Sequence, residues 1–195
     1  KGLNGMLTEN KTHFVRRSWT EIRLDRLAEN VRIYKEHCHA REIMAVVKAD
    51  AYGHGAAESA RVLADAGVRL FAVSNIIEAI ELRQAEIAGE ILILGYTPTE
   101  QLPLLTEYDI MQAVVSAEDA ARIAAQAPDV RVQYAIDTGM NRIGLDADDP
   151  AACEAVIRQY KLHVDGMFTH LCVADTDTPE CRSFTQVWRC PMCIV

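Results

Sequence analysis

Val and Ile gather in short runs from Ile43 onward, and longer Ala-rich stretches separate these runs. This alternation constrains the fold more than any other feature of the chain. Continuous apolar runs of this length predict buried parallel strands, at 43–48, 69–74, 91–94, 110–115, 130–137 and 164–169. Apolar residues spaced three and four apart predict helices between them, at 56–66, 76–88, 99–107, 117–126 and 150–160. Six strands alternating with helices leave two architectures, the (β/α)8 barrel and the open doubly wound sheet.

The segment before these strands predicts one more helix and an edge strand. Apolar residues recur at helical spacing over 24–38, and Asp25 is suited to cap the start of this helix. The preceding residues, 19–24, are interpreted as an edge strand. No Gly-x-Gly-x-x-Gly sequence follows the first buried strand, which argues against a dinucleotide site. A barrel needs eight strands, so about six strands predict either an incomplete barrel or an open sheet.

Composition argues against two classes of protein. The formal net charge is −8 and the acidic residues are spread along the chain. The composition therefore argues against nucleic-acid binding, which needs a basic surface. No run approaches the roughly 20 apolar residues that a membrane helix needs. The polar segment from Lys1 to Arg17 also lacks the apolar centre of a secretory signal. Six cysteines in a chain this rich in apolar residues indicate reduced cytoplasmic thiols rather than a disulfide-stapled fold.

The end of the first buried strand carries the most informative motif. It reads Val-Val-Lys-Ala-Asp-Ala-Tyr-Gly-His-Gly over 46–55, and Lys48 stands where the apolar run stops. Barrel strands present active-site residues at this end. A lysine among apolar neighbours loses its proton more readily than a solvated one, and its amine can form a Schiff base with a carbonyl compound. The two glycines permit a tight turn near a ligand, and the N-terminus of the following helix would attract a phosphate.

This motif resembles the first-strand signature of the alanine racemase family. The resemblance implies that Lys48 binds pyridoxal 5'-phosphate covalently and exchanges a proton with one face of the substrate α-carbon. It also implies that Tyr52 contacts the phosphate of the cofactor. The length of the matching string makes the motif strongly specific.

A second stretch agrees with the resemblance. Ile-Asp-Thr-Gly-Met-Asn-Arg-Ile-Gly over 136–144 is similar to the family's Asp-Thr-Gly-Met-x-Arg-x-Gly segment. The match implies that Arg142 contacts the phenolic oxygen of the cofactor and the substrate carboxylate region, with Met140 also at the substrate. A guanidinium can hold a phenolate and a carboxylate without losing its charge. Many family members carry a modified lysine where this chain has Ala135, so we expect an anion or Asn141 to position Arg142 instead.

A third stretch, Phe-Thr-His-Leu-Cys-Val-Ala-Asp over 168–175, resembles the family's Thr-His-x-x-x-Ala-Asp run. The match implies that His170 lies under the pyridine ring of the cofactor. Leu94, at another strand end, matches an apolar residue that lines the cofactor pocket. The residues of the third stretch also resemble the corresponding sequence of Gram-positive enzymes, among them serine/alanine racemases associated with vancomycin resistance. Some of those enzymes are fused to a membrane domain, and the segment Lys11–Arg17 is interpreted either as such a junction or as a basic leader.

The resemblance covers about 18–186 and implies an α/β fold, a (β/α)8 TIM-type barrel truncated after about six strands. It leaves 1–17 as a polar leader or linker and 187–195 as a tail unlike the family, of the kind that a shifted reading frame or a cloning scar produces. The family's C-terminal β-domain is expected to be absent. That region supplies phosphate ligands and the second catalytic base, which comes from the partner subunit of a homodimer. The parent is therefore expected to racemise a small amino acid in the cytoplasm, and this chain alone to do so poorly or not at all.

Four other interpretations stay open at this point. A different pyridoxal-phosphate barrel, such as a decarboxylase of basic amino acids, matches the lysine motif less well. A pyridoxal-phosphate homeostasis protein has the same barrel without the C-terminal domain, and the short chain favours it. The pair Cys190-x-x-Cys193 could bind zinc with Cys181, Cys172 or His170, although one such pair is a weak signal, so no metal is expected. The chain could also be the inactive product of an interrupted gene.

Overall fold

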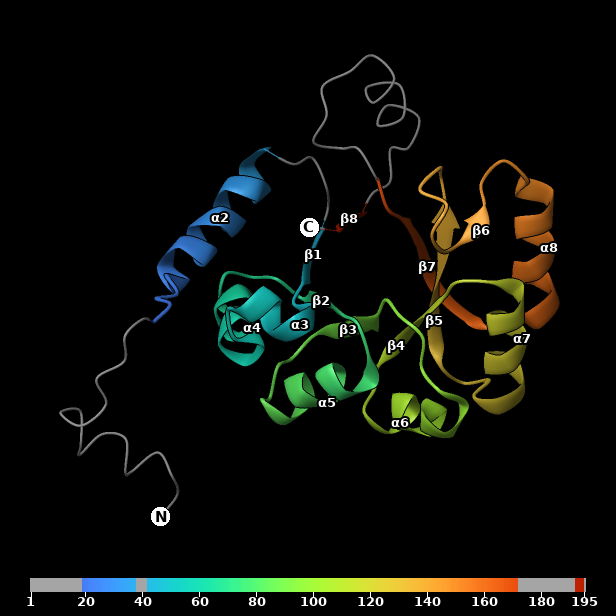
Figure 1. Ribbon diagram of the computed structural model, residues 1–195, viewed down its shortest axis with the longest axis horizontal. Coiled ribbons are helices and arrows are strands. Elements are labelled where there is room, and N and C mark those ends of the chain that lie inside the picture. Colours follow the sequence, from blue (N-terminus) through green and yellow to red (C-terminus); the bar gives the residue numbers. More distant parts are fainter. Residues whose placement is uncertain (1–18, 38–41, 172–191, 195) are drawn as a thin grey trace.

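In the computed structural model, residues 19–37 and 42–171 are described in full and residues 192–194 as backbone. Every paired strand in this part of the chain is parallel to its neighbour. The sheet runs in the order β6-β5-β4-β3-β2-β1-β8, and β7 also pairs with β5. Figure 1 shows the strands as an open arc with the helices along its outer side.

Six of the strands are those that the apolar runs predict, and the two short strands β6 and β8 were not predicted. The strands are β1 (Glu42–Val46), β2 (Leu70–Val73), β3 (Glu90–Ile93), β4 (Met111–Val114), β5 (Arg131–Asp137), the two-residue β6 (Leu145–Asp146), β7 (His163–Thr169) and β8 (Met192–Ile194). The helices are α2 (Leu24–His37), α3 (Lys48–Gly53), α4 (Ala56–Asp65), α5 (Ile76–Gln84), a 3-10 turn (Thr99–Gln101) continued by α6 (Leu102–Glu107), α7 (Ala117–Gln126) and α8 (Pro150–Tyr160).

Two separate apolar clusters decide between the two architectures. The larger one lies between the outer face of the sheet and the helices, and joins strand residues such as Phe71 and Tyr134 to helix residues such as Leu82 and Ile123. The smaller one lies on the other face and consists of strand residues alone, which are Met44, Ala72, Leu92, Met111 and Ala113. In a doubly wound sheet helices would cover both faces, so the structure confirms the truncated barrel.

Local sequence explains where the helices begin. The side chain of Asn75 accepts hydrogen bonds from the amides of Ile77 and Glu78 at the start of α5. Ser116 and Asp149 cap α7 and α8 in the same way. Pro103 lies in the first turn of α6, where its missing amide hydrogen is not needed, so the helix tolerates it.

Two expectations about the start of the chain are wrong. Residues 19–23 form no strand, and Trp19 is 74% exposed. Leu24, the last residue of that predicted strand, is instead the first residue of α2. Asp25 lies inside α2, where its carboxylate accepts two hydrogen bonds from Arg23. An isolated extended segment has no sheet to satisfy its backbone groups, and among the described residues this one has no pairing strand.

The open side of the arc is built differently from the rest. Each of β1 to β4 is followed by a helix that packs on the outer face, and α8 packs on the same face after β5 and β6. On β7, Val164 and Met167 are 37% and 48% exposed. At the other end, the backbone of Met192–Ile194 pairs with β1, although the tail was expected to be unlike the family. Of the helices in the described ranges, none has both the length and the apolar character needed to cross a bilayer.

Candidate active site at the C-terminal edge of the sheet

A left-handed turn follows β1 and starts at Lys48. The φ angles of Ala49, Asp50, Ala51 and Tyr52 lie between +51° and +56°. Each non-glycine residue in this conformation costs about 1–2 kcal/mol, so four in succession need support from their surroundings. Backbone hydrogen bonds supply part of it, because the Ala51 amide donates to the carbonyl of Val47 at 2.9 Å.

Two carboxylates fasten the turn from outside. Glu78 on α5 accepts from the amide of Ala49 at 3.0 Å, and its other oxygen accepts from the amide of Ser74 at 2.8 Å. Asp50 accepts from the amide of Ala56 at 2.7 Å. The start of α4, which the sequence suggested as a phosphate site, thus already binds a carboxylate of the chain itself.

Lys48 and Tyr52 are the two predicted residues of this turn. Lys48 is half-buried, and its Nζ lies 6.0 Å from the centre of the Tyr52 ring. Tyr52 is 61% exposed. The turn therefore presents an amine and a phenol at the same edge of the sheet.

Leu94 follows β3 at this edge and packs against the inner cluster. The loop after it is stabilised by hydrogen bonds from the side chain of Gln112, which is fully buried. Gln112 donates to the carbonyl of Gly95 at 2.7 Å and accepts from the Thr97 hydroxyl at 2.6 Å. Arg122 donates to the carbonyl of Thr97 at 2.9 Å. These contacts fix the chain directly after Leu94.

The loop after β5 carries Met140, which is half-buried, and Arg142, which is exposed. Asp137 organises this loop, because one of its oxygens accepts from the amides of Gly139 and Asn141 at 2.9 and 3.0 Å. These backbone hydrogen bonds, with Gly139 the strongest contributor, hold the pKa of Asp137 below its ordinary value.

The expected support for Arg142 takes a different form. The Asn141 side chain donates to the carbonyl of Gly139 at 3.2 Å, so it stabilises the loop rather than the guanidinium. Ala135 is 2% exposed and pairs with Phe168 of β7, whose side chain packs on the inner cluster. No hydrogen bond or ion pair to the Arg142 side chain occurs within the described ranges. The side chain is therefore open to a ligand.

His170 follows β7 directly and is exposed. The Thr169 hydroxyl lies 2.7 Å from that of Thr138, so the ends of β7 and β5 are joined side by side. Lys48, Leu94, Arg142 and His170 therefore all follow the C-terminal ends of parallel strands in one sheet. An amine, a phenol, a guanidinium and an imidazole at one edge fit a cofactor with an aldehyde, a phosphate and an aromatic ring.

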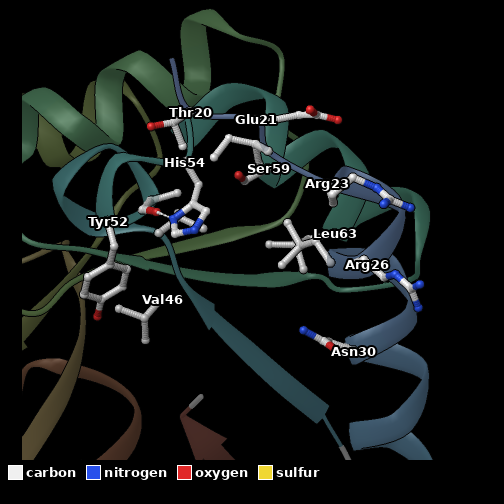
Figure 2. Close-up of a pocket in the computed structure, with 14 residues that line it drawn as sticks. Thr20, Glu21, Arg23, Arg26, Asn30, Val46, Tyr52, His54, Ser59 and Leu63 are labelled. Carbon is white, nitrogen blue, oxygen red and sulfur yellow. Dashed lines mark hydrogen bonds between the residues drawn. The ribbon is translucent and has the colours of Figure 1, made fainter. Parts of the chain in front are cut away.

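A cavity of about 520 Å³ lies beside this edge, between α2 and α4 (Figure 2). Tyr52 is the one predicted site residue that lines it. Figure 2 shows His54 and Ser59 on the α3–α4 side, with Arg26 and Asn30 of α2 opposite. The cavity is thus on the helix side of β1 and does not join Lys48 to Arg142 or His170.

The zinc interpretation receives no support in the part of the chain that the structure covers. No group of three His, Cys, Asp or Glu side chains there is placed to hold a metal ion. Cys172, Cys181 and Cys190 lie outside the described residues, and Cys193 is described only as backbone. The leader over 1–17 also lies outside them.

The sequence did not reveal the residues that fix the backbone around the candidate site. Glu78 and the pair Thr138–Thr169 make their contacts across strands, so spacing along the chain does not reveal the partners. The signal for Glu78 was present as Asn75-x-x-Glu78, the pattern of a capping box. It would have placed Glu78 at a helix start, without naming Ala49.

Comparison with known proteins finds relatives of this chain in sequence and in structure. The family profile for the N-terminal domain of alanine racemase matches residues 22–190. An alanine racemase of Clostridium tetani is 41% identical over 167 residues, covering 80% of this chain and 42% of that protein. An alanine racemase structure from Clostridium difficile 630 has a TM-score of 0.77 and 37% identity, over 89% of this chain and 47% of that one.

A histidine racemase structure from Leuconostoc mesenteroides is also similar, with a TM-score of 0.72 and 30% identity over 84% of this chain and 46% of that one. The chain spans about half the length of the curated relatives that it matches. The matched profile covers the strand ends at which Lys48, Arg142 and His170 lie. The chain therefore belongs to the alanine racemase family and corresponds to its N-terminal barrel domain.

Proposed function

We propose that the parent of this chain racemises a small amino acid, with pyridoxal 5'-phosphate bound at Lys48. The observation that carries the proposal is the common position of Lys48, Arg142 and His170 after the C-terminal ends of β1, β5 and β7. Enzymes of the alanine racemase family depend on this cofactor. When bound, it draws electrons from the substrate α-carbon and makes the proton there acidic.

The residues of this chain have separate roles in the proposal. Lys48 holds the cofactor and then removes or returns the α-proton on one face at its Nζ atom. Arg142 holds the phenolic oxygen and the substrate carboxylate through charge-assisted hydrogen bonds, with Met140 beside the substrate. Tyr52 would donate its hydroxyl to the phosphate, and His170 would contact the ring. Leu94 supplies an apolar wall.

Two-base racemisation also needs a group on the opposite face. The family resemblance assigns that base to a region outside these 195 residues and to the partner subunit of a homodimer. We therefore expect the chain alone to racemise poorly or not at all. We retain 1–17 as a polar leader or linker, 18–186 as the partial barrel, and 187–195 as a tail unlike the family, of which 192–194 pair with β1.

Alanine is the proposed substrate, for peptidoglycan precursors in the cytoplasm. Serine is the alternative, if the parent belongs to the subtype linked to vancomycin resistance. Turnover of each L-amino acid by the full-length parent separates the two.

Incubation of the 195-residue chain with pyridoxal phosphate, followed by borohydride reduction and peptide mapping, tests the central assignment. We expect stoichiometric label on Lys48, no label there in Lys48→Ala, and unchanged labelling in Lys161→Arg, which alters an exposed lysine. Label spread over surface lysines in the unmodified chain would contradict the proposal.

A further inference from the structure

Glu78 joins the two strand ends nearest to Lys48. Its Oε1 accepts from the amide of Ala49 at 3.0 Å, and its Oε2 accepts from the amide of Ser74 at 2.8 Å. The first amide belongs to the peptide bond between Lys48 and Ala49. The second belongs to the residue directly after β2. One carboxylate on α5 thus connects the backbone of the candidate lysine to the neighbouring strand.

This contact begins where the sheet stops. The last backbone hydrogen bond between β1 and β2 near the site runs from the Val47 amide to the carbonyl of Ala72, at 2.9 Å. Beyond it the chain enters the left-handed turn, with φ +52° at Ala49. The ladder can no longer orient the backbone there, and the conformation is intrinsically unfavourable for alanine. Glu78 takes over the position that the next ladder bond would hold.

The chemistry of the contact requires a carboxylate. Both of its partners are N–H donors, and an ionised carboxylate offers an acceptor oxygen to each. A glutamine of the same shape offers one acceptor and turns an NH2 group toward the other donor. The position in α5 is also unusual. In a capping box the glutamate three residues after the cap bonds back to the amide of the cap itself, whereas Glu78 reaches past Asn75 to Ser74 and Ala49.

The location of these hydrogen bonds separates positioning from stability. The Ala49 contact is exposed and the Ser74 contact is part-buried, so water can replace the carboxylate at both amides. Loss of Glu78 therefore leaves few unsatisfied groups and costs little global stability. Water cannot replace the fixed link between α5, β2 and the Lys48–Ala49 peptide. Without Glu78 the backbone at Lys48 is therefore held less firmly in its orientation relative to the sheet.

We propose that Glu78 is a positioning residue for Lys48, holding the Lys48–Ala49 peptide so that the amine projects from the sheet edge in one orientation. The inference rests on the proposed cofactor role of Lys48.

The test compares Glu78→Gln with Glu81→Gln in the 195-residue chain. Glu81 is exposed on the same helix, and its side chain makes no hydrogen bond or ion pair within the described residues, so it is a matched control for loss of one charge. The first readout needs no cofactor and is amide hydrogen exchange by NMR. In Glu78→Gln the amides of Ala49 and Ser74 are expected to exchange roughly tenfold faster, the factor that one charge-assisted hydrogen bond supplies. The Phe71 amide inside β2 is expected to keep its protection.

The second readout is the pyridoxal phosphate concentration that gives half-maximal borohydride-trapped label on Lys48. We expect it to rise roughly tenfold in Glu78→Gln and to stay unchanged in Glu81→Gln, with similar urea midpoints for both variants. If Glu78→Gln reaches half-maximal label on Lys48 at an unchanged pyridoxal phosphate concentration, this inference alone is overturned. Glu78 then only stabilises the turn. No label on Lys48 in the unmodified chain would overturn the cofactor proposal and this inference with it.

Discussion

The hydroxyl of Thr138 lies 2.7 Å from the hydroxyl of Thr169, and this hydrogen bond joins the chain directly after β5 to the last residue of β7. Thr138 begins the loop that leads to Arg142, and Thr169 immediately precedes His170. The relative placement of the two candidate cofactor ligands therefore depends partly on this side-chain contact, beside the backbone pairing of β5 with β7.

Thr138→Val tests this dependence, because valine has nearly the same shape and removes the hydroxyl. Thr138 is 8% exposed, so its former partner is left in a partly dry site, and we expect a loss of about 1 kcal/mol in the free energy of unfolding. Urea unfolding of Thr138→Val, Thr169→Val and the double variant measures it. A double variant no less stable than either single variant confirms that the two changes remove the same bond, whereas fully additive losses would contradict it.

Gly144 closes the loop that carries Arg142, and its backbone conformation leaves no room for a side chain. Its φ is +120°, and a Cβ atom would lie 2.6 Å from the amide nitrogen of Asp137. We expect Gly144→Ala to cost about 3 kcal/mol, because strain and a backbone clash act together. Gly53 is the control, with φ +85° and nothing within 4 Å of its Cβ position. Gly53→Ala should cost only about 1 kcal/mol of strain, and equal losses by calorimetry would contradict this account.

Arg131 is the cation of an ion-pair network at the opposite edge of the sheet. It lies 2.6 Å from Glu90, 2.8 Å from Asp109 and 3.1 Å from Asp165, and its hydrogen bond to Glu90 contributes most to raising its pKa. Arg131→Met leaves three carboxylates without their common cation, and we expect about 1–2 kcal/mol of destabilisation at neutral pH. The difference in the free energy of unfolding between the variant and the unmodified chain should narrow at high salt, which screens ion pairs. A difference independent of salt would show that lost packing causes the effect.

Asp137 gives the loop a defined response to acid. Its pKa is held below the ordinary value by backbone hydrogen bonds, so the unfolded chain binds a proton at this site more readily than the folded chain. Stability from this group is present above about pH 4 and is lost as the pH falls through the folded-state pKa. We expect Asp137→Asn to be less stable than the unmodified chain at neutral pH and equal to it near the acid limit, in urea titrations. Asp129→Asn, at an exposed carboxylate outside this loop, is the control for loss of one negative charge.

The sequence predicted the six longer strands and the helices between them because the apolar runs are continuous and the helices show clear spacing. It missed the short elements α3, β6 and β8. It failed at 19–23, where a strand-like segment has no partner within the described residues. It placed Lys48 at a strand end but gave no sign that four left-handed residues follow. Alanine and tyrosine rarely take that conformation, so only contacts with the rest of the fold reveal it. The roles assigned to Lys48, Arg142 and His170 remain predictions.

The order of pairing in the sheet bears on how the chain acquires its fold. Strands β1 to β4 each pair with the next in sequence, and β5 pairs with β7 across a connection that contains β6 and α8. The pairing of β1 with β8 is the exception, because its partners lie at opposite ends of the described chain. Low sequence separation between partners lowers the entropy lost on closing each loop and speeds folding. Strands β1 to β7 can therefore assemble in chain order as a ribosome releases them, before any later region of a longer polypeptide is synthesised.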